Sequence, residues 1–169
     1  MGADQDLEIR RVDGLALVRC RAPQTAPLRD LLDRMPPSAG HAIQLVWAEV
    51  LWRSPGVWWV KSRDHAAHAL IARLEGAASA IDISDSQVTF ALDGPRARTT
   101  LARGCPIDLH PGSFPPDSVA ATRFEHFDVV IHARGDESFD LHVPRSYARD
   151  AEDWLRRCLD LARLDPHAI

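Results

Sequence analysis

The segment VTFALDGPRARTTLARGCPIDLHP, residues 88–111, is the one from which we interpret the rest of the chain. Apolar side chains alternate with small or polar ones at Val88, Phe90 and Leu92, which is the period of a half-buried strand. Pro95 suits the first position of a helix, where its missing N–H would have no partner in any case. The segment therefore predicts a strand, a turn, a short helix and then a compact polar loop.

The loop after this helix is short and stiff. We expect Gly104 to end the helix in a left-handed conformation. Pro106 and Pro111 fix the backbone on either side of Asp108 and His110. A random surface connection needs less organisation than this, so the loop is a candidate site, although its residues form no evident catalytic set.

Cys105 is the first residue to test as a nucleophile, because a thiolate reacts when a helix end or a base lowers its pKa. It follows Gly104, at the C-terminal end of the predicted helix, and the partial negative charge there disfavours a thiolate. Cysteine is also enriched in protein interiors. We therefore expect a structural role for Cys105 and predict no catalytic residue in this chain.

The composition limits the classes of protein to consider. The chain has 169 residues, of which 46% are hydrophobic, and this fits a single domain over residues 1–169 with a real core. A net charge of −4 argues against nucleic acid as a partner, and there is no apolar run of transmembrane length. The N-terminal sequence MGADQDLEIRR has no apolar centre, and three scattered cysteines make no disulfide framework. We therefore expect a cytoplasmic protein that does not contact membranes.

Strand-like and helix-like periods follow one another along the chain. Apolar residues four and seven positions apart predict an amphipathic helix over residues 67–74, and a second apolar stripe predicts a closing helix that Ser146 caps. Residues 41–52 read as one strand. Further strands are expected over residues 57–60, 80–84, 86–92, 119–124, 127–133 and 138–143. This order predicts an α+β fold with two layers, in which helices cover a mostly antiparallel sheet.

For each of the other candidate sites, a purely structural role is possible as well as a functional one. Arg145 and Ser146 could bind an anion at a helix start, but capping by Ser146 explains the pair without a ligand. Trp58 and Trp59 are adjacent in a predicted strand and must face opposite sides. One of them therefore meets a partner, or the protein's own helices cover both faces. His132 and His142 could pair across a hairpin, but no metal-binding or nucleotide-binding spacing is present, so neither kind of site is predicted.

Residues 103–111, RGCPIDLHP, resemble the [KR]-G-C-P-[LI]-D-L-H-P segment of the gamma subunit of heterotetrameric sarcosine oxidase. Residues 139–148, FDLHVPRSYA, are similar to that family's F-x-L-x-V-x-R-S-x-A motif. Weaker matches occur in the same order at residues 52–58, 81–85, 114–116, 120–123 and 154–155. As an ordered set, these motifs are fairly specific, and they span roughly residues 50–157.

The resemblance implies an aminomethyltransferase folate-binding-like fold, with a divergent segment over residues 1–40 and a gamma-like core over residues 41–163. It also implies a heterotetramer that oxidatively demethylates sarcosine to glycine. In such a complex FAD, FMN, NAD, tetrahydrofolate and zinc belong to the alpha, beta and delta subunits, and the gamma subunit packs chiefly against alpha. Under this interpretation the candidate residues shape the fold or the partner surface; they are Trp58, Gly104, Cys105, Pro106, Asp108, His110, Arg145 and Ser146.

Two alternatives remain open at this point. The chain could bind folate on its own, as its fold relatives do. Folate-binding proteins linked to iron–sulfur maintenance carry K-G-C-Y-x-G-Q here, whereas this chain has Pro106 in place of the Tyr and Leu109 at or near the Gln. The chain could also be a gamma-like subunit that serves another N-methyl amine, such as dimethylglycine.

Overall fold

The computed structural model describes residues 7–164, except for the side chains of residues 162 and 163. Residues 1–6, which entered the prediction of a cytoplasmic location, lie outside this range. The backbone divides into two compact units, one made of residues 7–12 and 87–164 and the other of residues 13–86. Within the described range, no helix is both long and apolar enough to cross a membrane. The single domain expected over residues 1–169 stays a prediction.

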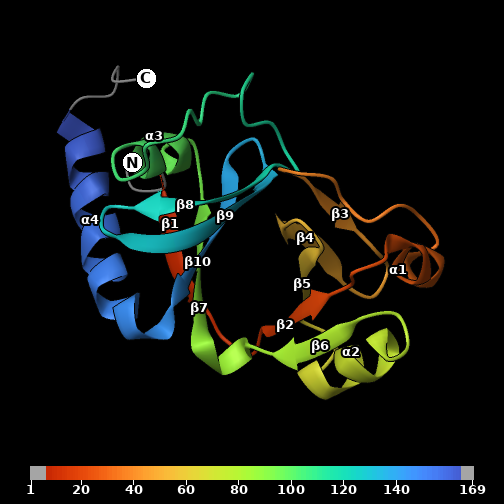
Figure 1. The fold of residues 1–169 in the computed structure, drawn as a ribbon. Helices are drawn as coiled ribbons and strands as arrows, with labels where there is room; N and C mark the ends of the chain where they lie inside the picture. Colours follow the sequence, from red (N-terminus) through yellow and green to blue (C-terminus); the bar gives the residue numbers. More distant parts are fainter. Residues whose placement is uncertain (1–6, 165–169) are drawn as a thin grey trace. The chain divides into compact units, whose positions relative to one another are not determined.

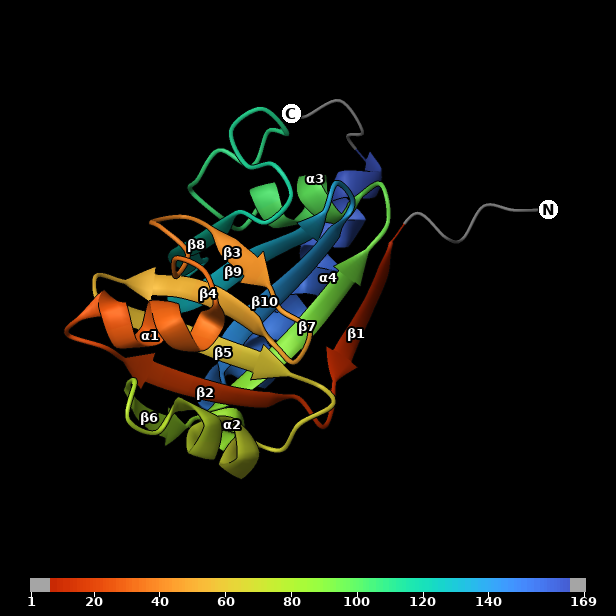
Figure 2. The same ribbon diagram turned by 90° about the vertical axis from the view of Figure 1, so that its right-hand side faces the viewer.

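The first unit contains a five-stranded antiparallel sheet in the order β1-β7-β10-β9-β8 (Figures 1 and 2). Its strands are β1 (Glu8–Val12), β7 (Gln87–Asp93), β8 (Val119–Phe124), β9 (Phe127–Gly135) and β10 (Ser138–Pro144). Its helices are α3 (Ala97–Ala102), the 3-10 turn η2 (Arg145–Tyr147) and α4 (Ala148–Leu164). The strand, turn, short helix and loop predicted from residues 88–111 are therefore present.

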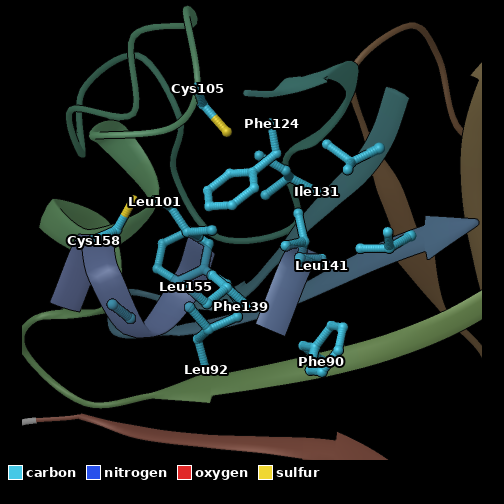
Figure 3. Packing of buried hydrophobic residues seen from close by; sticks show 14 of the residues in the cluster. Phe90, Leu92, Leu101, Cys105, Phe124, Ile131, Phe139, Leu141, Leu155 and Cys158 are labelled. Atoms are coloured by element: carbon cyan, nitrogen blue, oxygen red, sulfur yellow. The ribbon is translucent and has the colours of Figure 1, made fainter. Parts of the chain in front are cut away.

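The core of the first unit lies between one face of this sheet and helices α3 and α4 (Figure 3). Alternate residues of β7, Phe90 and Leu92, pack there beside Leu101 of α3 and Leu155 of α4. All four side chains are buried. Fully burying a side chain of this size stabilises the fold by about 1.5–3 kcal/mol, so the apolar period of the strand fixes which face the helices cover.

The second unit has its own five-stranded antiparallel sheet, in the order β3-β4-β5-β2-β6. Its elements are β2 (Ala16–Arg21), α1 (Thr25–Leu32), β3 (Ala42–Gln44), β4 (Glu49–Ser54), β5 (Val57–Ser62), α2 (Ala67–Leu74), β6 (Ser79–Asp82) and the 3-10 turn η1 (Ser84–Ser86). Leu28 of α1 and Leu70 of α2 pack with Val18, Val50 and Val60 on one sheet face. The helix predicted over residues 67–74 is confirmed.

The predicted α+β class with antiparallel strands covered by helices is confirmed, but one predicted strand is wrong. Residues 41–52 form a hairpin of β3 and β4 and not one strand. The backbone N–H of Leu45 donates to the carbonyl of Ala48 at 2.8 Å and closes the turn. Residues 45–48, LVWA, contain none of the glycine, asparagine or proline signals that mark a turn in a sequence.

Candidate functional site

The loop over residues 103–118 is held from inside by Arg98 on α3. The Arg98 guanidinium donates from Nη1 to the carbonyls of Leu109 (2.5 Å) and Phe114 (2.9 Å), and from Nε to the carbonyl of Asp136 (3.2 Å). Its Cζ lies 4.9 Å from the ring centroid of Phe139. One buried cation therefore ties two positions in the middle of the loop to the β9–β10 turn.

Burial lowers the pKa of Arg98, while the charge of Asp136 opposes that shift. Arginine stays protonated in proteins even when it is buried. A guanidinium also offers several donors in one plane, and this allows three carbonyls to be satisfied at once. Arg98 is 7% exposed, and its bonds to Leu109 and Phe114 are formed away from water.

The exposed part of the loop is organised by its own polar side chains. The Asp108 carboxylate accepts from the backbone N–H of His110 (2.8 Å) and from the hydroxyl of Ser113 (2.5 Å). His110 Nδ1 accepts from the N–H of Gly112 at 3.1 Å. The Ser113 hydroxyl, and then the N–H of His110, lower the pKa of Asp108, so this carboxylate is charged at neutral pH. Asp108 and His110 thus shape the loop, and both remain exposed.

Gly104 has a different role from the predicted one. Its φ angle is not in the left-handed region, so it does not end α3 as a left-handed cap. A Cβ at this position would lie 2.4 Å from Cε2 of Phe124. The Gly104 carbonyl also accepts from the N–H of Glu125 at 2.7 Å. The glycine is therefore needed because the end of β8 passes directly against the backbone.

Cys105 is buried in the core and not activated. Figure 3 shows it above Phe124, in the same cluster as Leu101 and Cys158. Desolvation by burial, with the nearby Cys158 and Glu125, raises the pKa of Cys105 to about 12. Burial likewise raises the pKa values of Cys20 and Cys158 to about 11. This environment fits the structural role predicted for Cys105.

We expect the three cysteines to resist alkylation in the folded chain. At pH 8, a thiol with a pKa of about 12 is roughly one part in ten thousand thiolate, and the thiolate is the reactive form. Labelling by iodoacetamide, followed by mass spectrometry, should be at least ~100-fold slower than labelling of the exposed variant Ser146→Cys. Unfolding in urea should make all three thiols react.

The same thiol pKa values give the sign of a pH effect on stability. Because the folded pKa values are raised, the folded state favours neutral thiols. This contribution is fully present below the ordinary thiol pKa of about 8.5 and is lost as the pH rises through about 11–12. Fast labelling of Cys105 at pH 8 without loss of fold would contradict this burial.

The remaining candidates lie on several elements. Arg145 and Ser146 are exposed on η2, before α4, and Pro144, not Ser146, occupies the N-cap position. No side chain caps this turn, and the capping of the closing helix α4 by Ser146 stays a prediction. Trp58 belongs to the other unit, where it is buried and its Nε1 donates to the carbonyl of Pro37 at 3.0 Å. Pro106 is exposed in the loop itself.

Trp58 and Trp59 are both buried within the chain, at 4% and 7% exposure. Neither side chain faces solvent within the chain. Trp58 joins the core of the second unit, and the Arg53 guanidinium lies 5.7 Å from the ring centroid of Trp59. Trp58 is therefore a structural residue in this chain.

Sequence reasoning missed a set of buried and half-buried polar side chains on the sheet of the first unit. Thr89 Oγ1 and His142 Nδ1 are 2.8 Å apart, and Arg134 forms ion pairs with Asp93 (2.7 Å) and Asp140 (2.8 Å). Burial lowers the pKa of Arg134, but the two carboxylates outweigh it and the net shift is upward. Polar residues at alternate strand positions are typical of a solvent-facing side, so the sequence carries no signal that these are buried.

His132 and His142, which could have paired across the hairpin, do not lie opposite each other. Asp140 lies opposite His132, and Val130 lies opposite His142. In the part of the chain that the structure describes, no group of three or more His, Cys, Asp or Glu residues is placed to hold a metal ion. The expectation that this chain carries no metal site stays a prediction.

The sequence is similar to that of known proteins. The family model described as "Sarcosine oxidase, gamma subunit family" matches residues 41–159, a range that includes the whole loop. The curated sarcosine oxidase subunit gamma from Corynebacterium sp. (strain U-96) is 27% identical over 111 residues, which is 63% of this chain and 53% of that protein. The chain thus matches about half the length of this relative.

Two solved structures share the fold. A chain of the heterotetrameric sarcosine oxidase from Corynebacterium sp. U-96, in complex with pyrrole 2-carboxylate, gives a TM-score of 0.82 at 22% identity over 94% of this chain and 86% of that one. The glycine cleavage system aminomethyltransferase T from Bartonella henselae gives 0.68 at 17% identity, over 89% of this chain and 45% of that one. The predicted aminomethyltransferase-like fold is thereby confirmed. Because the family model covers more than half of the sequence, this chain belongs to the sarcosine oxidase gamma subunit family.

Proposed function

We propose that this chain is the non-catalytic gamma-type subunit of a flavin-dependent sarcosine oxidase. The observation that carries the proposal is the family match over residues 41–159, which includes the organised loop. The chemistry of the loop supports it, because Cys105 is buried as a neutral thiol and Asp108 is engaged by the loop's own donors. These residues build a stiff surface and leave the reaction to other chains.

The other parts of the complex belong to the same proposal. The alpha, beta and delta subunits would hold FAD, FMN, NAD, tetrahydrofolate and zinc, and this chain would pack chiefly against alpha. The complex would convert sarcosine to glycine in the cytoplasm. Three buried, unbridged cysteines are consistent with a reducing compartment.

A pull-down from native cells tests the proposal. The tagged full chain should elute with larger subunits, show a flavin absorption spectrum and oxidise sarcosine. An untagged strain treated in the same way is the control and should give none of these. A chain that elutes alone, without colour and without activity, would overturn the proposal.

The same eluate addresses the choice of substrate. Dimethylglycine and betaine-derived amines should be assayed beside sarcosine at equal concentration. Faster oxidation of one of these amines would keep the subunit role and replace sarcosine as the substrate. If the co-eluting subunits oxidised none of these N-methyl amines, both the role as an amine oxidase subunit and sarcosine as the substrate would be excluded.

Folate binding by the isolated chain is the second candidate function, favoured by the fold shared with aminomethyltransferase T. Tetrahydrofolate titrated into the purified chain and followed by calorimetry tests it. Tight binding that Asp108→Asn abolishes would support this function. We expect no binding, because Pro106 and Leu109 replace the residues of the folate-binding motif and Leu109 is buried.

A further inference from the structure

One face of the sheet in the second unit carries arginines next to apolar side chains. Strand β2 lies between β5 and β6, and Arg19 is directly opposite Trp59 on one side and Ile81 on the other. Directly opposite residues of antiparallel strands point to the same face of the sheet. Arg21, two residues further along β2, shares that face because side chains alternate along a strand.

A third arginine reaches this face from β4. Leu51 pairs with Trp59, so both point to the same side. The register of β4 shifts at Arg53, so its contact with Trp59, and not the strand period, places it on this side. The Arg53 guanidinium lies over the Trp59 ring, 5.7 Å from its centroid. We call Arg19, Arg21, Arg53 and Ile81 the arginine face.

The charges of the arginine face are not neutralised within the described chain. Arg19 and Arg21 are exposed, and neither side chain makes an ion pair or a hydrogen bond with another described residue. Glu49, which lies on the same side of β4, is already paired with Lys61 at 2.5 Å. Ile81 is 57% exposed beside Arg19. A chain with a net charge of −4 thus places three arginines on one sheet face, Arg19 and Arg21 on the strand next to Ile81 and Arg53 over Trp59. The same face also holds the buried side chains of Leu17, Leu51, Trp59 and Lys61.

We propose that the arginine face docks onto an acidic surface of a partner protein in the complex of the proposed function, on which this inference rests. Arginine is enriched at protein interfaces because its planar guanidinium binds carboxylates with two parallel hydrogen bonds. Arg19 and Arg21 are about 7 Å apart along the strand, so they match two separate carboxylates better than one small anion. The exposed Ile81 adds an apolar contact, which a nucleic-acid backbone would not use.

The test compares two double variants of the full chain. Arg19→Gln with Arg21→Gln removes two charges from the arginine face. Arg34→Gln with Arg63→Gln removes two exposed charges elsewhere in the same unit, whose side chains also have no described partner. Each purified chain is titrated into the flavin-bearing subunits recovered in the pull-down and freed of the tagged chain, at low and at high salt.

We expect the R19Q/R21Q chain to bind at least ~10-fold more weakly than wild type at low salt, because opposite charges attract most strongly there. Its affinity should also depend less on salt, while the R34Q/R63Q chain should behave as wild type. Equal weakening by both variants, or no weakening by R19Q/R21Q, would overturn the inference. So would nucleic acid that co-purifies with the wild-type chain and is lost only from R19Q/R21Q while subunit binding is unchanged.

The outcome for the proposed function stays separate. If wild-type chain binds no flavin-bearing subunits at all, the proposed function fails before the variants are compared. If wild type binds and R19Q/R21Q binds equally well, only the arginine face is excluded as the contact. Circular dichroism should show that all the variants keep the wild-type fold, since every substituted side chain is exposed.

Discussion

Replacing Arg98 with methionine is expected to lower the free energy of unfolding of the unit that contains residues 87–164 by about 3–5 kcal/mol. Three carbonyl groups, those of Leu109, Phe114 and Asp136, lose the donor that satisfies them. A polar group left without a partner in the interior costs about 1–3 kcal/mol, and methionine can replace the packing on Phe139 but not the donors.

Hydrogen exchange detected by mass spectrometry is the appropriate measurement, because it reports on peptides of one unit without assuming that the whole chain unfolds together. Peptides from residues 105–118 should exchange first and fastest in the Arg98→Met chain. Arg98→Lys should rescue little, because an ammonium cannot reach three carbonyls in one plane.

Arg149→Met is the matched control, since Arg149 is exposed on α4 and has no described side-chain partner. Its effect should stay within about 0.5 kcal/mol. If Arg98→Met changed the exchange of the loop no more than Arg149→Met does, the loop would be held by its own turns and not by Arg98.

The strands near the C-terminus show what the sequence could predict. β8, β9 and β10 were expected within two residues of their observed ends, because their apolar period is clear and Gly135-Asp136 marks the hairpin. Local patterns determine such elements. The division into two sheets depends on which strands pair across long distances, such as β1 with β7, and no local pattern contains that information.

The sequence predicts where the candidate loop lies, but not which residue holds it in place. Pro106, Asp108 and His110 marked the loop because their types are unusual together in a short connection. Arg98 was missed because an arginine in a short helix normally points to solvent, and only the folded loop supplies carbonyls for it. The arginine face was missed for a related reason, because Arg19, Arg53 and Ile81 come to share one face only when the four strands β4, β5, β2 and β6 pair.

Gly104→Ala is the second variant with a large expected effect, about 3 kcal/mol or more of lost stability in the same unit. The new Cβ would lie 2.4–2.8 Å from three atoms of the Phe124 ring. Phe124 is fully buried, so its ring cannot turn into solvent and the backbone of β8 or α3 must shift. Gly135→Ala is the matched control, because its Cβ would meet Ser138 at an ordinary 3.7 Å.

Two further variants separate close packing from a left-handed cap as the reason for Gly104. Asparagine tolerates the left-handed region better than alanine, so a cap would make Gly104→Asn the milder change. Close packing predicts the reverse order, because asparagine is larger and more polar against the same ring. It also predicts that Phe124→Leu costs less in the Gly104→Ala chain than in wild type, since the smaller side chain relieves the clash. Additive effects in this double-mutant cycle, measured by hydrogen exchange, would mean that the two residues do not press on each other.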